Sequence, residues 1–305
     1  MGTTFSIKIP KLPQGLDPSE LKKEINDTLI FVNSMMSTYQ ADSELSKLNQ
    51  NPSTGWIGIS AQLAEVLDEA LRISELSDGA YDVTVGPLVN LWGFGPGDFK
   101  QEVPNPAAIK ALLTECGFRM IRLNEQKNAV RKNLPDIYID LSSIAKGYGV
   151  DQLADLLSGY VIRDYLIEVG GELRVRGSSA GGKNWTIGIE KPVPGERLIE
   201  QAIQLKDVSV ATSGDYRNFF EVEGVRYSHM IDPRTGWPVS HDLASVTVLD
   251  KTAMRADGLA TALMVLGSDA GFRLAQEHHI VAFFIKRDGA GFAKLASSKF
   301  PVESK

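Results

Sequence analysis

Apolar residues recur every three or four positions along several stretches of the chain, as they do on one face of a helix. The clearest stretch follows Asp17-Pro18-Ser19-Glu20, where an acidic cap and an early proline precede apolar residues at helical spacing from Leu21 to Val32. This pattern predicts a helix that ends near Met36. Similar patterns predict helices over residues 42–48, 60–78, 105–116 and 145–158, and another that begins at Thr252.

Elsewhere the apolar residues alternate with polar ones, which is the pattern of strands with one buried face. Strands are expected over residues 3–9, 119–123, 128–132, 136–140, 185–190, 201–205, 208–212, 218–222, 226–231 and 244–250. A strand over 166–175 carries Gly170 and Gly171 in its middle, which indicates a bulge or a close backbone approach to a ligand. Runs of strands beside segregated helices predict an α+β fold, and we expect one compact domain over residues 1–305 with closely packed subdomains.

Residues 80–97 combine recurrent glycine and proline with large apolar side chains. Neither a helix nor a strand accommodates this mixture well, so we expect a packed irregular loop that shapes a pocket. A buried crossover without a ligand is an equally good interpretation of the same residues.

The charge balance limits the class of partner. The 305 residues include 32 basic and 38 acidic side chains, for a net charge of −6, and the basic residues form no runs. We therefore expect no nucleic acid partner, whereas an anionic ligand could still bind where a metal ion or a few well placed cations offset the negative charge. Cys116 is the only cysteine, which excludes an internal disulfide and a cysteine-based zinc site.

The start of the chain carries no recognisable export signal. Residues 1–5 already form the entrance to an expected strand, and no apolar run reaches the roughly 20 residues that a membrane-spanning helix requires. We expect that a natural leader preceded Met1 and is missing from this chain.

The first candidate binding site is the stretch 136–151. It passes from an alternating strand through Ser142 and Ser143 into a helix that carries Lys146 in its first turn. Free backbone N–H groups, the positive end of the helix dipole and a lysine would meet there, which favours a phosphate group. In the alternative interpretation, the serines only cap the helix and Lys146 is a solvated surface charge.

A second candidate site lies on the helix that Thr252 caps. Asp257 and Thr261 are four residues apart, so a carboxylate and a hydroxyl project from one helix face. Oxygen donors among apolar neighbours suit Mg²⁺, which binds one or two carboxylates together with water and substrate phosphates. Alternatively, Asp257 interacts only with the helix dipole.

His229 is the best general-base candidate among the histidines. It precedes the turn Asp232-Pro233-Arg234-Thr235-Gly236, from which a side chain can reach into a cleft. His241 is a weaker candidate, and His278 and His279 are expected at a helix end before a strand. A purely structural histidine is the alternative interpretation.

Together these stretches resemble the ApbE family of FAD:protein FMN transferases over nearly the whole chain. The motifs occur in the family's order: Met1-Gly2-Thr3, Met36-Ser37-Thr38-Tyr39 with Ser43, residues 79–89, Asp140-Leu141 to Tyr148, Val169-Gly170-Gly171, Thr212-Ser213-Gly214, His229 to Pro233, and Ala256-Asp257 with Thr261. Each motif is weak alone, and their shared order makes the resemblance strong.

The resemblance implies a T-fold-like arrangement of helices and antiparallel sheets, with FAD as substrate and a bound Mg²⁺. The family holds FAD at positions that match Met1, Tyr39, Ala80, Tyr81, Asp82, Asp140, Lys146 and Ile231. It holds Mg²⁺ at positions that match the backbone carbonyl of Ser143 and the side chains of Asp257 and Thr261. Some members carry an acidic residue where this chain has Lys146.

The same resemblance makes His229 and Asp257 the catalytic residues. His229 would take the proton from a Ser or Thr hydroxyl of an acceptor protein, and this hydroxyl would attack the FMN-side phosphorus of FAD and release AMP. The implied acceptors are flavoprotein subunits of sodium-pumping NADH:quinone oxidoreductase (Nqr) and Rnf-type complexes, or FMN-binding domains. The implied location is the periplasm, as an inner-membrane lipoprotein tethered through the leader.

Two rival functions would use the same residues. One is an Mg-dependent FAD pyrophosphatase that gives FMN and AMP, and the other is an FAD-binding carrier without turnover. A nicotinamide oxidoreductase fits less well, because the glycines at 93–97 and 170–171 lack the strand, turn and helix of the dinucleotide fingerprint.

Overall fold

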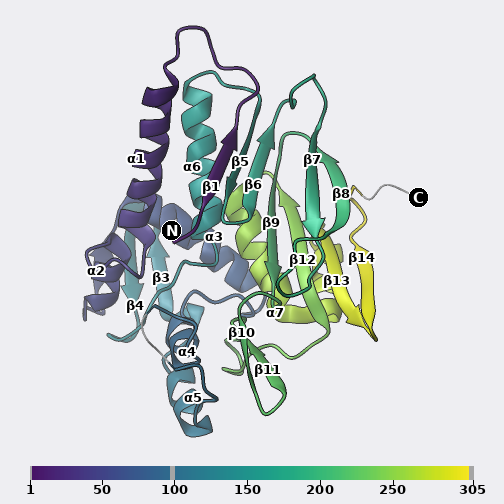
Figure 1. The fold of residues 1–305 in the computed structure, drawn as a ribbon. Coiled ribbons are helices and arrows are strands. Elements are labelled where there is room, and N and C mark those ends of the chain that lie inside the picture. Colours follow the sequence, from purple (N-terminus) through teal and green to yellow (C-terminus); the bar gives the residue numbers. More distant parts are fainter. Residues whose placement is uncertain (1, 97–99, 302–305) are drawn as a thin grey trace.

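The computed structural model describes residues 2–96 and 100–301, and Figure 1 shows their arrangement. The helices of the described chain are α1 (Pro18–Met36), α2 (Glu44–Gln50), α3 (Ala61–Leu76), α4 (Gly86–Leu91), α5 (Pro106–Leu113), α6 (Ala145–Gly159) and α7 (Ala253–Glu277). Two short 3-10 helices, η1 (Phe118–Met120) and η2 (Glu125–Lys127), flank a strand. None of the helices in the described ranges is both long enough and apolar enough to span a bilayer.

The centre of the fold is an antiparallel sheet of seven described strands. In spatial order they are β1 (Phe5–Lys8), β5 (Tyr165–Val169), β6 (Glu172–Arg176), β9 (Val208–Gly214), β12 (Leu243–Asp250), β13 (Val281–Asp288) and β14 (Gly291–Ala296). Each neighbouring pair is antiparallel. β12 is buried on both faces, and its run of uncharged residues from Leu243 to Leu249 reflects that burial.

Three smaller sheets surround the main one. They are formed by β2 (Trp56–Gly58), β4 (Ala129–Lys132) and β3 (Ile121–Asn124), by β7 (Trp185–Glu190) and β8 (Ile199–Leu205), and by β10 (Phe219–Val222) and β11 (Val225–Ser228). The last pair is a short hairpin that ends just before His229.

The main sheet lies between two layers. α6 and α7 pack against strands of the sheet, while α1 packs against α6 and α3 against α7 (Figure 1). The β7–β8 hairpin packs its apolar side chains, including Trp185 and Ile203, against Leu166 and Val175 of the sheet. This arrangement confirms the α+β fold with antiparallel sheets that the sequence predicts.

The helix caps read from the sequence are confirmed. Asp17 Oδ1 accepts the N–H of Ser19 at 2.8 Å at the start of α1. The hydroxyls of Ser60 and Thr252 cap α3 and α7 in the same way, at 3.1 and 3.3 Å. α7 continues to Glu277 through a kink at Gly267. Because these caps need only neighbouring residues, the sequence was sufficient to predict them.

The expectation of an irregular loop over residues 80–97 is wrong in part, and residue 97 lies outside the described residues. Residues 86–91 form α4, with Pro87 in its first turn, where the missing N–H of proline costs nothing. Trp92 follows α4 and is fully buried, and its Nε1–H donates to the carbonyl of Gly236 at 2.9 Å. This hydrogen bond connects the segment to the loop after His229.

Residues 136–140 do not form the predicted strand. The side chain of Asn49 takes the place of a partner strand, because its amide donates to the Ile139 carbonyl and its carbonyl accepts the Ile139 N–H, both at 2.8 Å. The next N–H, that of Asp140, donates to the Val83 carbonyl at 2.7 Å. The third strand of the small sheet is instead β2, which the sequence analysis missed.

Gly170 and Gly171 lie in a turn between two strands and not in the middle of one strand. Val169 pairs with Glu172, so the two glycines form a two-residue hairpin loop. Their φ values of 62° and 109° are both positive, which glycine adopts without strain. The predicted bulge is therefore a hairpin, and the turn delivers Glu172 to the start of β6.

Two predicted elements end early. The helix predicted over 105–116 ends at Leu113, and the N–H of Gly117 donates to Thr84 Oγ1 at 2.6 Å, which turns the chain away. The strand predicted over 226–231 ends at Ser228, and Ile231 forms only an isolated bridge with Pro238.

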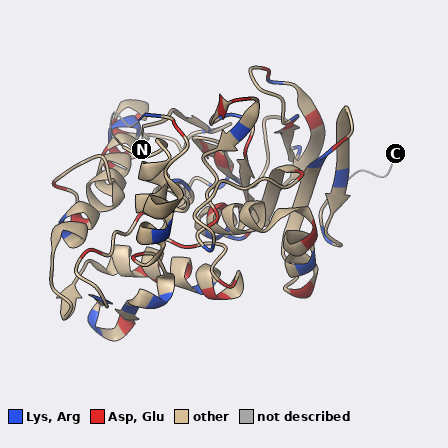
Figure 2. Ribbon diagram, turned by 90° about the horizontal axis from the view of Figure 1, so that it is seen from below, with Lys and Arg blue, Asp and Glu red and all other residues tan. Residues whose placement is uncertain are grey.

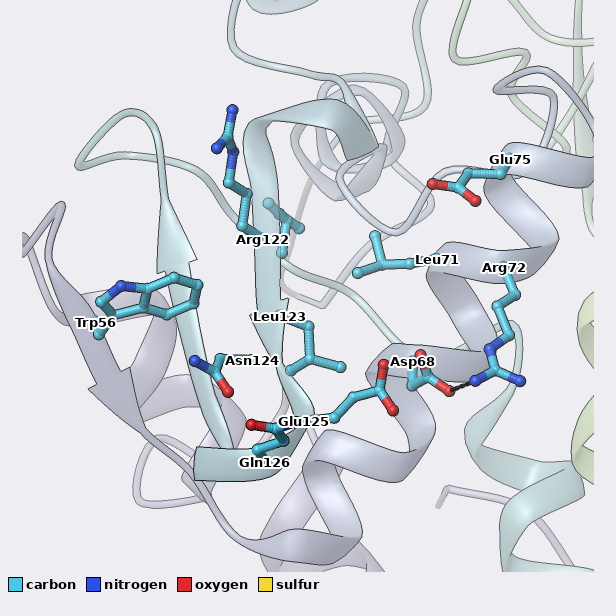
Figure 3. A pocket seen from close by; sticks show the side chains of 11 residues that line it. Trp56, Asp68, Leu71, Arg72, Glu75, Arg122, Leu123, Asn124, Glu125 and Gln126 are labelled. Atoms are coloured by element: carbon cyan, nitrogen blue, oxygen red, sulfur yellow. Dashed lines mark ion pairs between the residues drawn. The ribbon is translucent and has the colours of Figure 1, made fainter.

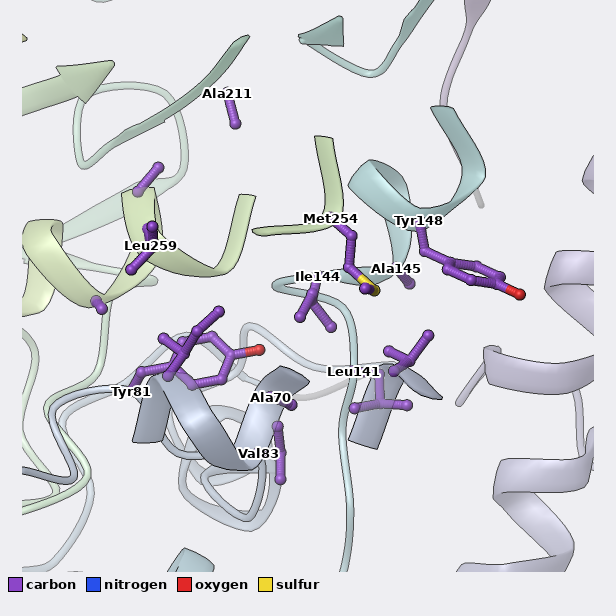
Figure 4. Packing of buried hydrophobic residues seen from close by; sticks show 14 of the residues in the cluster. Ala70, Tyr81, Val83, Leu141, Ile144, Ala145, Tyr148, Ala211, Met254 and Leu259 are labelled. Carbon is purple, nitrogen blue, oxygen red and sulfur yellow. The ribbon is translucent and has the colours of Figure 1, made fainter. Parts of the chain in front are cut away.

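The main hydrophobic core lies beneath α7 and beside the segment 137–145 (Figure 4). Tyr81, Leu141, Ile144 and Leu259 belong to this cluster and are at most 1% exposed. Each buried aliphatic side chain of this size contributes about 1.5–3 kcal/mol to stability. The residues around the predicted phosphate site are therefore held by the core from below.

Lys132 ends β4 and is fully buried. Its ammonium donates to three backbone carbonyls, those of Pro135 at 2.8 Å, Leu48 at 3.3 Å and Asn49 at 3.4 Å. The last two are carbonyls near the end of α2, where the helix dipole favours a cation. Lys132 thus connects α2 to the segment that leads to Asp140.

We expect Lys132→Met to lower the free energy of unfolding by about 1–3 kcal/mol, because it leaves buried carbonyls without a donor. The exposed Lys127 offers a matched control, since Lys127→Met removes the same charge from a nearby surface turn. Chemical denaturation of both variants measures the difference. Equal stability of the two variants would show that the Lys132 ammonium does not hold this part of the fold together.

Candidate functional site

A pocket of about 420 Å³ lies where six stretches of the chain meet. Its walls come from residues 80–94, 140–146, 170–172, 212–218, 229–233 and 257–265. A second hollow of about 480 Å³ is lined by residues 32–40 of α1 and the following loop. The two hollows share Asp140, Ser142 and Lys146 in their walls, so they adjoin at the start of α6.

The structure brings nearly all of the residues singled out in the sequence to these two hollows. The first is lined by Ala80, Tyr81, Asp82, Asp140, Ser143, Lys146, His229, Ile231, Asp257 and Thr261. Tyr39 lines the second and is exposed. Met1 lies outside the described residues.

The start of α6 is capped by a residue from another helix. Ile144 occupies the cap position and offers no side-chain acceptor, while Asp257 Oδ2 of α7 accepts the N–H of Gly147 at 3.0 Å. The capping role considered for the serines is therefore wrong: the N–H of Ser142 donates to Asp140 Oδ1 at 2.8 Å, and Ser143 Oγ donates to the Tyr81 hydroxyl at 3.0 Å.

α6 caps α7 in return. Asp151 accepts the N–H groups of Ala253 and Met254, the first two residues of α7, at 3.0 and 2.9 Å, and it also pairs with Arg174. Two helix ends thus exchange carboxylates, each satisfying backbone donors of the other.

Gly147 makes this approach of the two helices possible. A Cβ at this position would lie 2.2 Å from the Ala253 carbonyl oxygen and 2.7 Å from Met254 Cα, both backbone atoms. Any larger residue would therefore push the start of α6 away from the start of α7. Asp257 would then lose the backbone N–H that holds its carboxylate at the pocket.

Lys146 lies between two carboxylates. Its Nζ is 2.8 Å from Glu172 Oε1 and 3.5 Å from Asp257 Oδ1, and its side chain is 31% exposed. Burial by itself lowers the pKa of Lys146, but the carboxylates of Asp257 and Glu172 outweigh this effect and the pKa is raised. Lys146 is therefore a permanent cation at the pocket, and its alternative interpretation as a solvated surface charge is wrong.

Glu172 is one of the pocket residues that were not predicted from the sequence, as are Tyr216, Arg217 and Asn218. Burial raises the pKa of Glu172 to about 8, and the nearby Asp257 adds to the rise while Lys146 opposes it. Burial also raises the pKa of Asp257, and Lys146 opposes that shift. In the sequence, the only indication of a special role for Glu172 is its position directly after two glycines. This position becomes informative only once the glycines are known to form a hairpin turn.

Tyr81 and Asp82 support the wall opposite α6. Burial raises the pKa of the Tyr81 phenol, so it stays neutral and acts as a hydrogen-bond partner of Ser143. Asp82 Oδ1 accepts from the N–H and the hydroxyl of Thr84, at 2.8 and 2.7 Å, and Oδ2 accepts the Phe118 N–H at 2.7 Å. The Asp82 carboxylate thereby fixes the segment 80–85 at the pocket wall.

His229 reaches the pocket from the end of the β10–β11 hairpin. Its backbone N–H donates to the Asn218 carbonyl at 3.0 Å, and its Nδ1 lies 3.1 Å from the same oxygen. A carbonyl can only accept, so Nδ1 carries the proton and Nε2 keeps its lone pair. Burial lowers the pKa of His229, while the Asn218 carbonyl opposes the shift, so the neutral form prevails at pH 7.

The hairpin is attached to the main sheet through Asp215. This carboxylate is 4% exposed and pairs with Arg226 of β11 and, at 2.6 Å, with Arg287 of β13. His241 lies outside the pocket, and both of its ring nitrogens are buried without a hydrogen-bond partner in the described structure. His278 and His279 follow α7 and precede β13, as predicted.

The donors at the pocket have the chemistry that Mg²⁺ prefers. Asp257, Thr261 and Ser143 offer a carboxylate, a hydroxyl and a carbonyl, all of them oxygen ligands. The carboxyl oxygen Oε2 of Glu172 is buried in the same pocket without a hydrogen-bond partner in the described part of the chain, so the pocket holds one more oxygen donor. Residues 2–96 and 100–301 hold no cluster of three or more His, Cys, Asp or Glu suited to a metal, so a magnesium ion here would depend on water and phosphate for further ligands.

Other surfaces of the molecule offer weaker sites. Figure 2 shows lysine and arginine interspersed with aspartate and glutamate along the elements, with no single basic face in that view. A hollow of about 840 Å³ lies between α3 and β3, lined by residues such as Trp56, Arg72, Arg122 and Glu125 (Figure 3). It is the larger hollow, but it is shallow, its charges are of both signs, and none of the sequence motifs reaches it.

Comparisons with known proteins agree with the geometry. The ApbE family matches residues 1–285. An FAD:protein FMN transferase of Vibrio cholerae is 46% identical over 98% of this chain and 89% of its own length, and one of Haemophilus influenzae is 46% identical over 98% and 88%. The solved flavin transferase ApbE from Vibrio cholerae superposes with a TM-score of 0.92 at 45% identity, covering 98% of this chain and 95% of that one. The Pseudomonas stutzeri flavinyl transferase ApbE, in its apo form, gives 0.89 at 38% identity, covering 98% and 92%.

The exchange of caps between α6 and α7 predicts opposite effects for two glycines of α6. Gly147→Ala should lower the free energy of unfolding by about 1–3 kcal/mol, because the added methyl group meets backbone atoms. Gly159→Ala should leave stability unchanged or raise it by up to about 1 kcal/mol, because no atom lies within 4 Å of the added Cβ. Thermal and chemical unfolding of both variants provide the comparison, and a Gly147→Ala protein as stable as Gly159→Ala would contradict the close contact.

The environment of His229 predicts a titration below the usual histidine range. We expect the His229 ring to gain its proton only at a pH below about 6.5, because burial disfavours the imidazolium. NMR of the histidine ring protons as a function of pH measures this, and His229→Gln assigns the resonance by its disappearance. A midpoint above 6.5 would mean that carboxylates near the pocket dominate over burial.

Proposed function

This chain belongs to the ApbE family and is an FAD:protein FMN transferase. We propose that the transfer takes place in the pocket between α6, α7 and the β10–β11 hairpin. The observation that carries the proposal is the meeting of three kinds of group in one pocket. These are the oxygen donors Ser143, Asp257 and Thr261, the cation Lys146, and a histidine with a free Nε2.

FAD would occupy both adjoining hollows. The family's FAD positions are divided between them, with Tyr39 in one and Ala80, Tyr81, Asp82 and Ile231 in the other, while Asp140 and Lys146 line both. Lys146 in the first turn of α6 supplies positive charge at the junction, where a diphosphate would need it. Met1 belongs to the same proposed set, by resemblance alone.

Ser143, Asp257 and Thr261 would hold a magnesium ion. When bound, such an ion supplies positive charge to phosphoryl oxygens and stabilises the charge that develops as the pyrophosphate breaks. The protein contributes the placement of these donors, because the Asp257 carboxylate is already oriented by the Gly147 N–H.

His229 would act as the general base. Its Nε2 takes the proton from a Ser or Thr hydroxyl of the acceptor protein, and the hydroxyl oxygen attacks the FMN-side phosphorus. A phosphoester bond forms to the acceptor, the pyrophosphate bond breaks, and AMP leaves. The Asn218 carbonyl holds the tautomer with Nδ1 protonated, so Nε2 is ready to accept.

The acceptor and the location follow from the family and are proposals. We expect acceptors to be flavoprotein subunits of Nqr and Rnf-type complexes or FMN-binding domains. We expect the protein to work in the periplasm as an inner-membrane lipoprotein.

The decisive experiment incubates the protein with FAD, Mg²⁺ and an acceptor domain, followed by denaturation and mass spectrometry of the acceptor. Wild type should add one FMN to a Ser or Thr and release AMP. Asp257→Ala and His229→Gln should each lower the rate by at least about a hundredfold. This is the smallest rate loss usually seen when a general base or an electrostatic catalyst is removed. Chelation of Mg²⁺ should abolish the reaction.

Two outcomes would contradict the transferase mechanism. Free FMN and AMP with an unlabelled acceptor would indicate an FAD pyrophosphatase. FAD that stays intact in the presence of wild type, Mg²⁺ and the acceptor would indicate a flavin carrier. Glu200→Gln is a suitable control, because it removes a carboxylate that pairs with Lys294, away from the pocket, and should retain full activity.

A further inference from the structure

Glu172 is a buried carboxylate to which the reaction above gives no role. It is the first residue of β6, directly after the glycine turn, and is 3% exposed. Its Oε1 lies 2.8 Å from Lys146 Nζ, while its Oε2 is buried without a hydrogen-bond partner among the described residues. Such an unpaired buried oxygen is costly, so a functional reason for it is worth seeking.

The distances around Lys146 are unequal. The 2.8 Å contact with Glu172 has the length of a charge-assisted hydrogen bond, whereas the 3.5 Å separation from Asp257 Oδ1 exceeds that length. The ammonium is thus bound to Glu172 and only near Asp257. Two acidic side chains thus share one cation, and the shorter contact is the one with Glu172.

The glycine turn fixes the path of the lysine side chain. A Cβ at Gly170 would lie 3.1 Å from Lys146 Cδ, so the bare backbone of the turn leaves room for the lysine to reach Glu172. On the other side, Asp257 Oδ2 is occupied by the Gly147 N–H. Lys146 Nζ lies nearest to Oδ1, so a lysine drawn closer to Asp257 would compete with a metal ion for this carboxylate.

We propose that Glu172 is a positioning residue that holds the Lys146 ammonium off Asp257 and so keeps the Asp257 carboxylate available to a divalent cation. The proposal rests on the magnesium site of the proposed function. Without Glu172, the lysine would pair with Asp257 directly and oppose the metal ion at Oδ1. With Glu172, the same lysine stays at the junction of the two hollows.

A double-mutant cycle separates this role from a simple effect of charge. If Glu172 acts through Lys146, removing the lysine should make Glu172 unimportant for cation binding. If Glu172 only adds negative potential, its removal should weaken cation binding equally whether or not the lysine is present. Mn²⁺ serves as the probe, because free Mn²⁺ is counted directly by electron paramagnetic resonance in the absence of FAD.

Glu172→Gln should weaken Mn²⁺ binding by about fivefold or more in the otherwise unchanged protein, a coupling within the usual range for groups in contact. In the Lys146→Met background, the same change should alter Mn²⁺ binding by less than about twofold. Glu172→Asp should weaken binding as Glu172→Gln does, because the shorter side chain keeps the charge but loses the contact. Glu200→Gln, which breaks another carboxylate–lysine pair, should bind Mn²⁺ like wild type.

Equal weakening by Glu172→Gln in both backgrounds would overturn the proposal in favour of a direct charge effect, as would normal binding by Glu172→Asp. No weakening in the otherwise unchanged protein would overturn it outright. Circular dichroism confirms that each variant is folded, and Glu172→Asp, the conservative change, supplies the comparison where Glu172→Gln does not fold.

Asp257→Ala distinguishes this failure from failure of the proposed metal site. If Asp257→Ala binds Mn²⁺ like wild type, the site itself is wrong, and Glu172 then has no carboxylate to protect. Suppose instead that Asp257→Ala does not bind Mn²⁺, and that the effect of Glu172→Gln on Mn²⁺ binding is the same with and without Lys146. The proposed metal site is then supported, and only the proposed role of Glu172 is wrong.

Discussion

The pocket depends on a mutual contact between the N-terminal halves of α6 and α7. Asp151 of α6 accepts the first N–H groups of α7, and Asp257 of α7 accepts the Gly147 N–H of α6. Each buried carboxylate is stabilised by the positive end of the other helix, and each helix gains the cap that its own sequence provides only in part. Because Gly147 has no side chain, the two backbones can approach closely enough for both contacts. The same contact places Asp257 and Lys146 next to each other in the wall of one cavity.

The remaining walls are attached to this pair by single polar contacts between distant segments. Asn49 supports the stretch before Asp140, Asp82 anchors the segment 80–85, and Asp215 connects the hairpin carrying His229 to the main sheet. Each contact satisfies backbone or charged donors that would otherwise be buried alone. The pocket is thus assembled from rigid parts, and its shape depends on a few buried carboxylates and amides rather than on any one loop.

The charged groups of the pocket offset the negative net charge of the chain, which would otherwise repel an anionic substrate. In the proposed function, a chain of net charge −6 receives a diphosphate in a pocket that buried acidic residues help to line. Lys146, the N-terminal end of α6 and the proposed magnesium ion are the groups that offset this negative charge. His229, the proposed base, is kept neutral by burial and is oriented by the Asn218 carbonyl, so its Nε2 can accept a proton while the cations remain charged.

The sequence by itself determined the elements and residues whose physics is local. The caps at Asp17, Ser60 and Thr252, the helical spacing of Asp257 and Thr261 and the α+β class were readable from neighbouring positions. Most of the other pocket residues, such as Tyr81 and Asp82, came from the resemblance of the sequence to the ApbE family. Only the tertiary structure decided what lies beyond that range. Residues 137–140 pair with the side chain of Asn49 and not with a strand, α4 replaces a loop, and Glu172 and Asp151 become functional or capping groups through partners far along the chain. The physical reason is that the role of a buried carboxylate or amide depends on the hydrogen-bond donors and acceptors that surround it in the fold. These partners come from distant segments, so the spacing of residues along the sequence does not reveal them.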